Sequence, residues 1–365
     1  MHSVYYIHNA PRGVFSCDLD KKDFIVRNMK DLFERLLILR SPGIGPASYN
    51  NLLRQFGSDS AILEHMDVSN ELRDSVLREV DLANRLNVHF ICDTDDLYPA
   101  HLKSIKNHPP ILTARGNIET LRRESVAIVG TRHATGGGMN FVADIACAFA
   151  EHNVAVVSGM AMGTDAAAHR GALRADGNMN TIAVLAGGVD YIWPLENESL
   201  YYEILERGVV VSDMPVGFVP KGTNFVQRNR IIAGIGEKLI LSEADSNSGS
   251  MKTAEFAKEY GRQIYAIPSH PADSRAVGPN SLIRSGAAIL CMGVADFFTE
   301  KNSVKKTEKT RESENPILDK IGTVPVSESV LAEIVGKSIL EIKRELVMLE
   351  LQGLIRKCDS GYVRA

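Results

Sequence analysis

The chain has 365 residues, 44% of them apolar and 24% charged, with a formal net charge of -4. This length favours two or three domains, and the apolar content suffices for a sizeable core. The net charge excludes binding of duplex DNA through overall basicity but leaves room for a local basic groove. The five cysteines contain no CxxC pair, which disfavours a zinc site or a disulfide framework. We find no signal-peptide pattern and no apolar run suited to a membrane helix, so we expect a cytoplasmic protein.

The N-terminal part is predicted to be helical. Residues 1–25 show no clear period and are expected to form a loosely attached tail. From Asn28, leucines recur at helical spacing, and a second helix should follow the Gly-Ile-Gly turn at 43–45. Two short helices joined by such a turn resemble a helix-hairpin-helix or sterile-alpha-motif-like unit, which would occupy residues 1–95. The turn could present N–H groups to a DNA phosphate, or its glycines could serve the turn alone, since it holds no Lys or Arg.

The central part is predicted to be a doubly wound α/β domain over residues 121–299, reached through a proline-containing connector at 96–120. Short apolar runs without polar alternation suit strands buried on both faces of a parallel sheet. Seven such runs lie at 126–130, 154–159, 181–188, 208–213, 238–244, 263–268 and 287–291. Most are separated by plausible helices, which favours a Rossmann-like sheet.

The C-terminal part is predicted to be a separate small domain. Residues 300–314 are almost wholly polar and charged, which is typical of a flexible linker. In 315–365, three helical segments followed by a hairpin look like a winged helix. Basic and acidic side chains balance there, so a protein contact is at least as plausible as specific DNA reading.

The first two central strands each end in a glycine-rich loop that leads into a helix. Helix N-termini offer unpaired N–H groups, so an anion site is expected beyond the carboxyl ends of these strands. The predicted phosphate contacts are Gly130, Thr131, Arg132, Gly159 and Gly163. The first loop lacks G-x-G-x-x-G, no acidic residue closes the second strand, and the P-loop motif is absent, which disfavours dinucleotide and P-loop ATP sites. The alternative is a purely structural glycine turn.

Asp165 and His169 stand four residues apart at the start of the second helix and share one face. They could form an acid–base pair, but no nucleophile stands at a telling spacing. The interpretation that we favour is that Asp165 caps the helix and His169 hydrogen-bonds within the loop network. Ser158, Asp190 and Glu243 are likewise expected to organise loops.

Three later segments extend the predicted site along the same sheet edge. Trp193 and Tyr191 offer stacking faces to bases or else pack in the core. The long loop 213–227 leads into a cationic cluster that is either a positive rim for phosphates or a solvated helix face. A Ser/Gly-rich loop then begins another helix suited to anions. The predicted contacts in these segments are Gly187, Gly188, Lys221, Arg228, Asn229, Arg230, Ser248, Gly249, Ser250, Lys252 and Thr253.

Several motifs, in this order, resemble the DNA-processing protein A family (DprA, also called Smf). They are VAIVGTR, SGMAMGTDAAAHRGAL, AVLAGGVDYIWPLEN, FVQRNRIIAG, SEADSNSGSMKTAEFAKEYGR, IYAIPSHP and GPNSLIRSGA. The resemblance covers almost the whole chain and implies an extended Rossmann fold that forms homodimers. It implies a protein that is not an enzyme and needs no cofactor: one that binds and protects single-stranded DNA and loads a RecA-type recombinase during natural transformation. It places Arg132 and the arginines of the RNR motif in a positively charged groove. The chain departs from the family at Met162 and Leu195, where basic residues are frequent.

Two other functions remain open. Residues 249–255 resemble the Gly-Thr-x-x-Glu helix start of nucleoside-monophosphate phosphoribohydrolases, although Ser248 stands where their second glycine would be. Alternatively, the chain is mainly an adaptor whose terminal domains contact protein partners.

Overall fold

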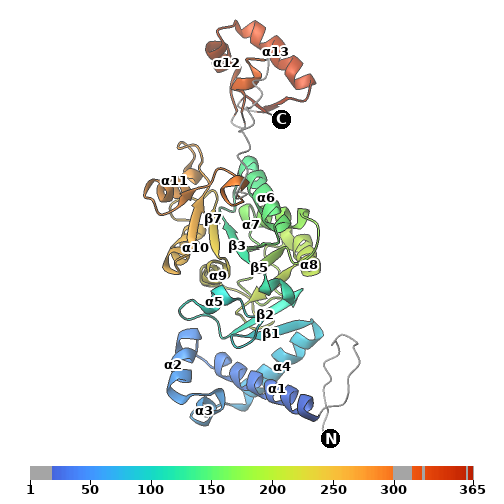
Figure 1. Cartoon of the computed structure of the whole chain (residues 1–365), viewed down its shortest axis with the longest axis vertical. Helices are drawn as coiled ribbons and strands as arrows, with labels where there is room; N and C mark the ends of the chain where they lie inside the picture. The colour runs from blue at the N-terminus through green and yellow to red at the C-terminus, as the bar shows by residue number, and fades with distance from the viewer. Residues whose placement is uncertain (1–18, 299–314, 323–324, 359–360, 365) are drawn as a thin grey trace. The chain divides into compact units, whose positions relative to one another are not determined.

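The computed structural model describes residues 19–298, 315–322, 325–358 and 361–364. The chain divides into two compact units, one ending at Phe297 and the other beginning at Phe298 (Figure 1). The predicted linker at 300–314 and residues 1–18 of the predicted tail lie outside the described residues. Within the described part of the chain, every helix is too short or too polar to cross a membrane.

The first unit begins with four helices. They are α1 (Leu19–Arg40), α2 (Pro46–Phe56), α3 (Asp59–Glu64) and α4 (Asn70–Arg85). The helical hairpin is therefore present, but α1 begins at Leu19, inside the predicted tail. Pro46 opens α2, where its fixed φ suits the first helical position. Ser58 and Ser69 cap α3 and α4 by accepting backbone N–H bonds.

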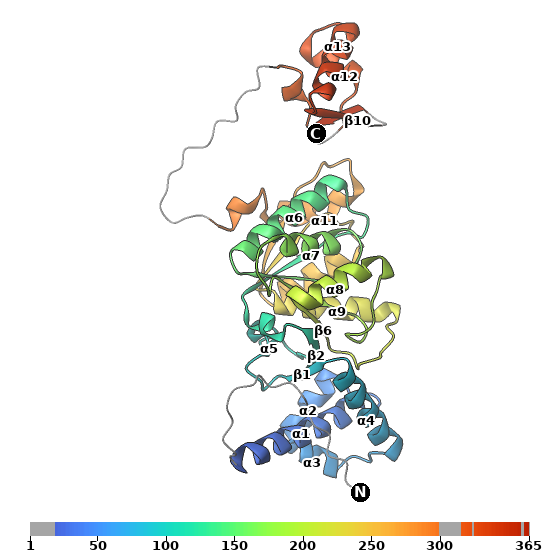
Figure 2. The same cartoon turned by 90° about the vertical axis from the view of Figure 1, so that its right-hand side faces the viewer.

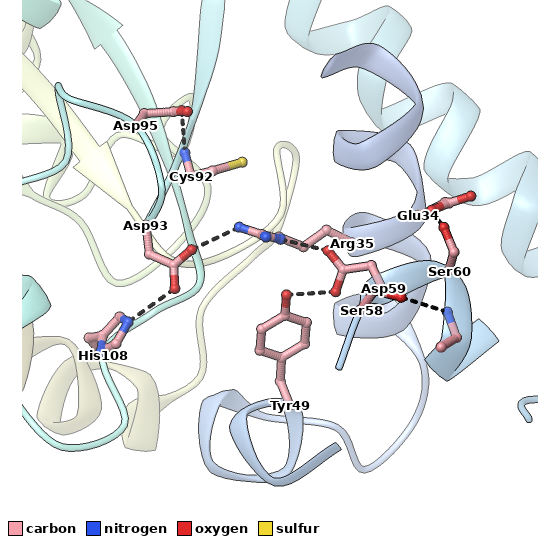
Figure 3. Close-up of polar contacts among 11 residues, drawn as sticks. Glu34, Arg35, Tyr49, Ser58, Asp59, Ser60, Cys92, Asp93, Asp95 and His108 are labelled. Atoms are coloured by element: carbon pink, nitrogen blue, oxygen red, sulfur yellow. Dashed lines mark hydrogen bonds and ion pairs between the residues drawn. The ribbon is translucent and has the colours of Figure 1, made fainter. Parts of the chain in front are cut away.

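An ion-pair cluster joins these helices to the sheet. The guanidinium of Arg35 lies between two carboxylates, at 3.0 Å from Asp59 and 2.8 Å from Asp93, as Figure 3 shows. Tyr49 donates to Asp59 at 2.7 Å, and His108 contacts Asp93 at 3.1 Å. Burial raises the pKa of Asp93, but the bond from His108 and the charge of Arg35 outweigh burial and hold the pKa below its ordinary value. The cluster thus ties α1 and α3 to the loop after the first strand.

The described residues of this unit form a nine-stranded sheet. Its strands are β1 (Val88–Cys92), β2 (Ile111–Gly116), β3 (Ser125–Val129), β4 (Ala155–Ser158), β5 (Thr181–Val184), β6 (Val209–Ser212), β7 (Lys238–Leu241), β8 (Gln263–Ala266) and β9 (Ile289–Leu290). The order is β1-β2-β6-β5-β4-β3-β7-β8-β9, parallel from β6 to β9, with β1 and β2 antiparallel at one edge. All seven predicted central strands are present.

The predicted connector at 96–120 is wrong in one respect. Residues 111–116 form β2, which pairs with β6 and places Thr113 opposite Ser212. The prolines at 109 and 110 precede this strand and do not interrupt it, so all of its N–H groups remain available for pairing. Both views place β1 and β2 next to the N-terminal helices (Figure 1, Figure 2).

Helices cover both faces of the sheet. They are α5 (Ala100–Lys103), α6 (Gly136–Glu151), α7 (Thr164–Arg174), α8 (Glu198–Arg207), α9 (Gly222–Ile235), α10 (Gly249–Glu259) and α11 (Val277–Arg284). One core joins α9 and α10 to the sheet, and another joins α7 and α8 to the opposite face. The chain leaves β3 towards β4 but leaves β7 towards β8, so the loops after these neighbouring strands diverge. Ligands in doubly wound sheets bind at this switch point.

The second unit has the predicted winged-helix elements. They are the short 3₁₀ helix η5 (Leu318–Lys320), α12 (Glu328–Val335), α13 (Ile339–Leu351), β10 (Ile355–Cys358) and β11 (Gly361–Arg364). Leu331, Ile342 and Leu346 belong to its core. The outer face of α13 is apolar as well, since Leu340 is 62% and Leu351 is 78% exposed.

Candidate functional site

A pocket of about 570 Å³ opens at the switch point. Its walls come from the loops after β3 and β4, from α7, α9 and the start of α10, and from Trp193 in the loop after β5. The predicted site residues that line it are Gly130, Thr131, Arg132, Asp165, Arg228, Asn229, Ser248, Gly249, Ser250 and Thr253. In the described ranges, no group of three or more His, Cys, Asp or Glu residues could hold a metal ion. The pocket is concave, with both apolar and hydrogen-bonding walls, as small-ligand sites usually are.

Glu243, the buried residue that follows β7, holds the loop after β3. Its carboxylate accepts the N–H of Thr135 at 2.7 Å and also the Thr135 hydroxyl. Its carbonyl accepts the N–H of Thr131 at 2.6 Å. Thr135 in turn caps α6 by accepting the N–H of Gly138 at 2.9 Å. The carboxylate of Glu243 therefore lies where an anion would bind the α6 N-terminus. The start of α10 also lines the pocket, and the side chain of its cap residue, Ser248, accepts no backbone N–H of that helix.

The glycines expected to approach phosphate instead serve close contacts within the protein. A Cβ on Gly163, whose φ is +72°, would lie 2.5 Å from the carbonyl oxygen of Arg132. A Cβ on Gly159 would lie 2.7 Å from the guanidinium of Arg228. Gly187 and Gly188 are buried against the loop after β6. None of these four lines the large pocket. Direct phosphate contact at these four positions therefore stays a prediction, and their close contacts explain why a side chain would not fit there.

Arg228 lies at the floor of the pocket and not on an exposed rim. It is only 6% exposed, and it donates to the carbonyls of Gly159 at 2.7 Å and of Val184. Its Nε donates to Asn229 at 3.2 Å. Burial lowers the pKa of Arg228 to about 10, against the opposing charge of Asp165. This corrects the prediction that Arg228 and Arg230 form one rim.

Asp165 and His169 do not form a pair in the structure. Asp165 lies inside α7, whose cap is Gly163, and accepts the N–H of Ala161 at 3.4 Å. Burial raises the pKa of Asp165, against the opposing charge of Arg228. His169 is fully buried, and its Nδ1 lies 2.6 Å from Oγ1 of Thr181 at the start of β5. The cap of α7 is therefore Gly163 and not Asp165, which instead holds the loop before α7, and the role of His169 in the loop network stays a prediction.

The other loop-organising residues each hold two segments together. Ser158 donates to the carbonyl of Ile128 at 2.6 Å and thereby joins β4 to β3. Asp190 accepts the N–H of Gly217 at 2.8 Å, which fastens the long loop after β6 to the loop after β5.

The remaining predicted cations lie outside the pocket lining. Arg230 is ion-paired with Asp213 at 2.6 Å and donates to the carbonyl of Asn107 at 3.1 Å. Lys252 is exposed and ion-paired with Glu255 at 2.8 Å. Lys221 is exposed at the start of α9. Because Glu255 lies with Lys252 outside the pocket, the geometry does not favour the phosphoribohydrolase alternative.

Arg132 and two aromatic rings form the rim of the pocket. The guanidinium of Arg132 lies 4.8 Å from the ring centroid of Trp193 and 5.9 Å from that of Phe225. The two rings are in edge contact, with centroids 4.4 Å apart. Arg132 is exposed, so it presents a cation directly beside two aromatic surfaces. Phe225 is not among the predicted site residues, although it stands three residues before Arg228 and shares its helix face.

Comparison with protein families gives three matches along the chain. A model described as DNA recombination-mediator protein A matches residues 89–302. A DprA-like N-terminal HHH domain matches residues 29–76, and a DprA winged helix domain matches residues 303–361.

The chain is also similar to individual proteins and solved structures of this family. Protein Smf of Synechocystis is 35% identical over 246 residues, which are 66% of this chain and 56% of that protein. The chain therefore matches little more than half the length of that relative. The structure of DNA processing protein A from Streptococcus pneumoniae is similar with a TM-score of 0.63 and 29% identity, covering 72% of this chain and 96% of that one. The DNA processing protein A of Helicobacter pylori, solved for its single-stranded DNA binding mode, gives a TM-score of 0.53 and 27% identity over 58% of this chain and 94% of that one.

Proposed function

The chain belongs to the DNA recombination-mediator protein A family, and from this premise we propose that it binds single-stranded DNA and acts as a recombination mediator in natural transformation. In this role it protects incoming strands and delivers them to a RecA-type recombinase in the cytoplasm, without catalysing a reaction. A homodimer formed through the central domain would present two such sites.

The rim of Arg132, Trp193 and Phe225 is the observation that carries this proposal. Proteins that bind single strands combine cations for the phosphates with aromatic faces for the bases. An exposed guanidinium lies against two rings at the mouth of the pocket. In a duplex the faces of the bases are stacked on their neighbours, so this combination favours unpaired strands.

A salt titration with labelled oligothymidine tests the proposal. The logarithm of the association constant should fall linearly with the logarithm of salt concentration, with a slope of about 0.7 for each phosphate neutralised. Arg132→Ala should weaken binding to all sequences alike and lower the slope by about 0.7. Arg122→Ala is the matched control, because Arg122 is exposed and ion-paired with Glu119 outside the pocket.

Two outcomes would contradict this function. One is a salt slope near zero, and the other is equal affinity for a duplex of the same length. Release of free base from a nucleotide by the purified protein would instead support the enzymatic alternative.

A further inference from the structure

The helix α9 has two sides with different surroundings. On one side, Phe225 and Arg228 line the pocket. Successive residues of an α-helix are about 100° apart, so Arg230 and Gly234 point away from that side. A Cβ on Gly234 would lie 2.7 Å from Cδ1 of Leu102 in α5. The far side of α9 is therefore packed closely against the segment 93–110, which joins β1 to β2.

Arg230 makes two interactions on this far side. Its Nη2 pairs with the carboxylate of Asp213 at 2.6 Å, and its Nη1 donates to the carbonyl of Asn107 at 3.1 Å. The side chains of Arg230 and Asp213 are only 18% and 12% exposed. Salt screens such a pair less than it screens a pair on the surface. Arg230 thus joins α9 to two other segments, the loop after β6 and the segment 93–110.

The carbonyl of Asn107 belongs to a firmly held part of the segment 93–110. Asn107 has a φ of +59°, in the left-handed region that few residues other than glycine occupy. The next residue, His108, lies 3.1 Å from Asp93. Asp93 is in turn ion-paired with Arg35 of α1 at 2.8 Å, as Figure 3 shows. Through Asn107, Arg230 therefore connects α9 to a segment that the N-terminal helices hold.

The surroundings of Arg230 do not suit a phosphate. Arg230 lies outside the pocket lining, and the carboxylate of Asp213 beside it would repel an anion. A phosphate could take this guanidinium only by replacing a partner that is already in place and mostly shielded from water. The same two interactions are well suited to holding a helix in position.

We propose that Arg230 is a positioning residue, which acts on the bound strand through the placement of α9 and not through contact with the strand. This inference rests on the proposed binding of single-stranded DNA. Arg230 fixes α9 against the loop after β6 and the segment 93–110. It thereby fixes Phe225 at the rim and Arg228 at the floor of the pocket, on the opposite side of the same helix.

The Asp213→Asn variant separates positioning from contact by the sign of its effect. If Arg230 positions α9, loss of the ion pair holds the helix less firmly and weakens binding of oligothymidine. If Arg230 contacts a phosphate, the same change removes a competing negative charge and strengthens binding. We expect binding at least about threefold weaker, within the range of couplings that packed elements transmit.

The salt dependence of Arg230 variants gives a second measurement. Arg230→Ala should weaken binding at least about threefold but leave the salt slope unchanged, whereas loss of a phosphate contact would lower the slope by about 0.7. Arg230→Lys keeps the pair with Asp213 but cannot reproduce the forked arrangement, so it should recover part of the affinity. The double variant Arg230→Ala, Asp213→Asn should bind no more weakly than Arg230→Ala, because both changes remove the same interaction.

The matched controls are Arg174→Ala and Asp144→Asn, which break an exposed ion pair outside the pocket. Both should leave the affinity and the salt slope at the wild-type values. All variants are compared well below their thermal melting temperatures, so that a loss of stability alone does not lower the affinity. If Arg230→Ala does not fold, the conservative variants Asp213→Asn and Arg230→Lys still give the sign and the slope.

The outcomes separate this inference from the proposed function. Stronger binding by Asp213→Asn, or a slope lowered by about 0.7 in an Arg230 variant, would make Arg230 a phosphate contact and overturn positioning. Unchanged affinity in every Arg230 and Asp213 variant would overturn it as well. Each of these results leaves the rim of Arg132 and the proposed function intact. A salt slope near zero for the wild-type protein would instead overturn the proposed function.

Discussion

His169 is buried in α7 with its Nδ1 against Thr181, while its Nε2 has no partner among the described residues. Burial lowers the pKa of His169 to about 3. In the unfolded chain the imidazole takes up a proton near pH 6.5, its ordinary pKa. Between these two values only the unfolded state binds the proton, so acidification favours unfolding.

The His169→Gln variant should therefore be less sensitive to acid. Below about pH 6, each pH unit should cost the wild-type protein about 1.4 kcal/mol more unfolding free energy than the variant. Denaturant unfolding between about pH 6 and about pH 4 measures the difference. Replacement of the exposed His133 by Gln is the control, and parallel pH profiles for wild type and His169→Gln would refute the effect.

Individual side chains were only partly predictable from the sequence. Arg228 and Arg230 are two residues apart, and on a helix that separation is about 200°, so the two side chains face opposite sides. Arg228 accordingly enters the protein, whereas Arg230 is ion-paired with Asp213 outside the pocket, so the RNR motif does not form one surface. The close contacts of Gly159 and Gly163 involve Arg228 and Arg132, which lie far from them in the chain, and no local pattern reveals such contacts.

The helix α4 holds the long loop after β6. Glu79 of α4 accepts the N–H of Val216 at 3.3 Å, and Arg40 of α1 binds both oxygens of Glu79 at 2.8 Å. This loop leads directly into α9, which carries Phe225 and Arg228 into the pocket. The N-terminal helices therefore help to position one wall of the site.

Replacing Glu79 should loosen this loop. Glu79→Ala leaves Arg40 without its buried partner and should lower the unfolding free energy by about 3 kcal/mol. Amide exchange at 213–221 should become faster, and oligothymidine should bind more weakly. Glu79→Gln, which keeps an acceptor for Val216, should restore slow exchange more than it restores stability.

The control for this variant is Glu71→Ala, which changes an exposed carboxylate on the same helix. If Glu79→Ala and Glu71→Ala show the same exchange in the loop, α4 does not position it.

Element types were predicted well where the pattern was strong. The apolar runs of β3 to β8 are buried on both faces, and such runs are recognisable in isolation. The strand β2 was missed because the two prolines before it suggested a loop. Its place in the sheet is set by pairing with β6, which lies nearly a hundred residues further along the chain, as Thr113 pairs with Ser212.

At the scale of the whole molecule, the chain divides into two units, and the proposed DNA site lies in the first unit, not in the winged helix. The unit from Phe298 has its own core and its own hairpin. The charge-balanced sequence of 315–365 and the apolar outer face of α13 suit a protein contact better than a phosphate backbone.

Removal of residues 315–365 should therefore leave the first unit intact. We expect the truncated protein to bind oligothymidine within about twofold of the full chain and to show the same salt slope, since the phosphate contacts proposed here lie in the first unit. Thermal melting of both proteins checks the fold. A large loss of affinity or a shallower slope would assign DNA contacts to the winged helix.

The structure divides the chain between Phe297 and Phe298, close to the polar, charged stretch 300–314 that we predict to be a linker, because such segments cannot form a core. The strand β1 lies within the predicted N-terminal range 1–95, yet it belongs to the same sheet as the central strands. A local sequence pattern predicts that a segment is a strand, but it does not predict which other strand it pairs with.

The single tryptophan of the chain has a consequence for observation. Trp193 lies against Arg132 and Phe225 at the mouth of the pocket, so all indole emission of the protein originates at this one contact. A strand that displaces the guanidinium or stacks on the ring alters that emission directly. The protein thus contains its own optical probe of the site, and occupancy can be followed in unlabelled protein with unlabelled DNA.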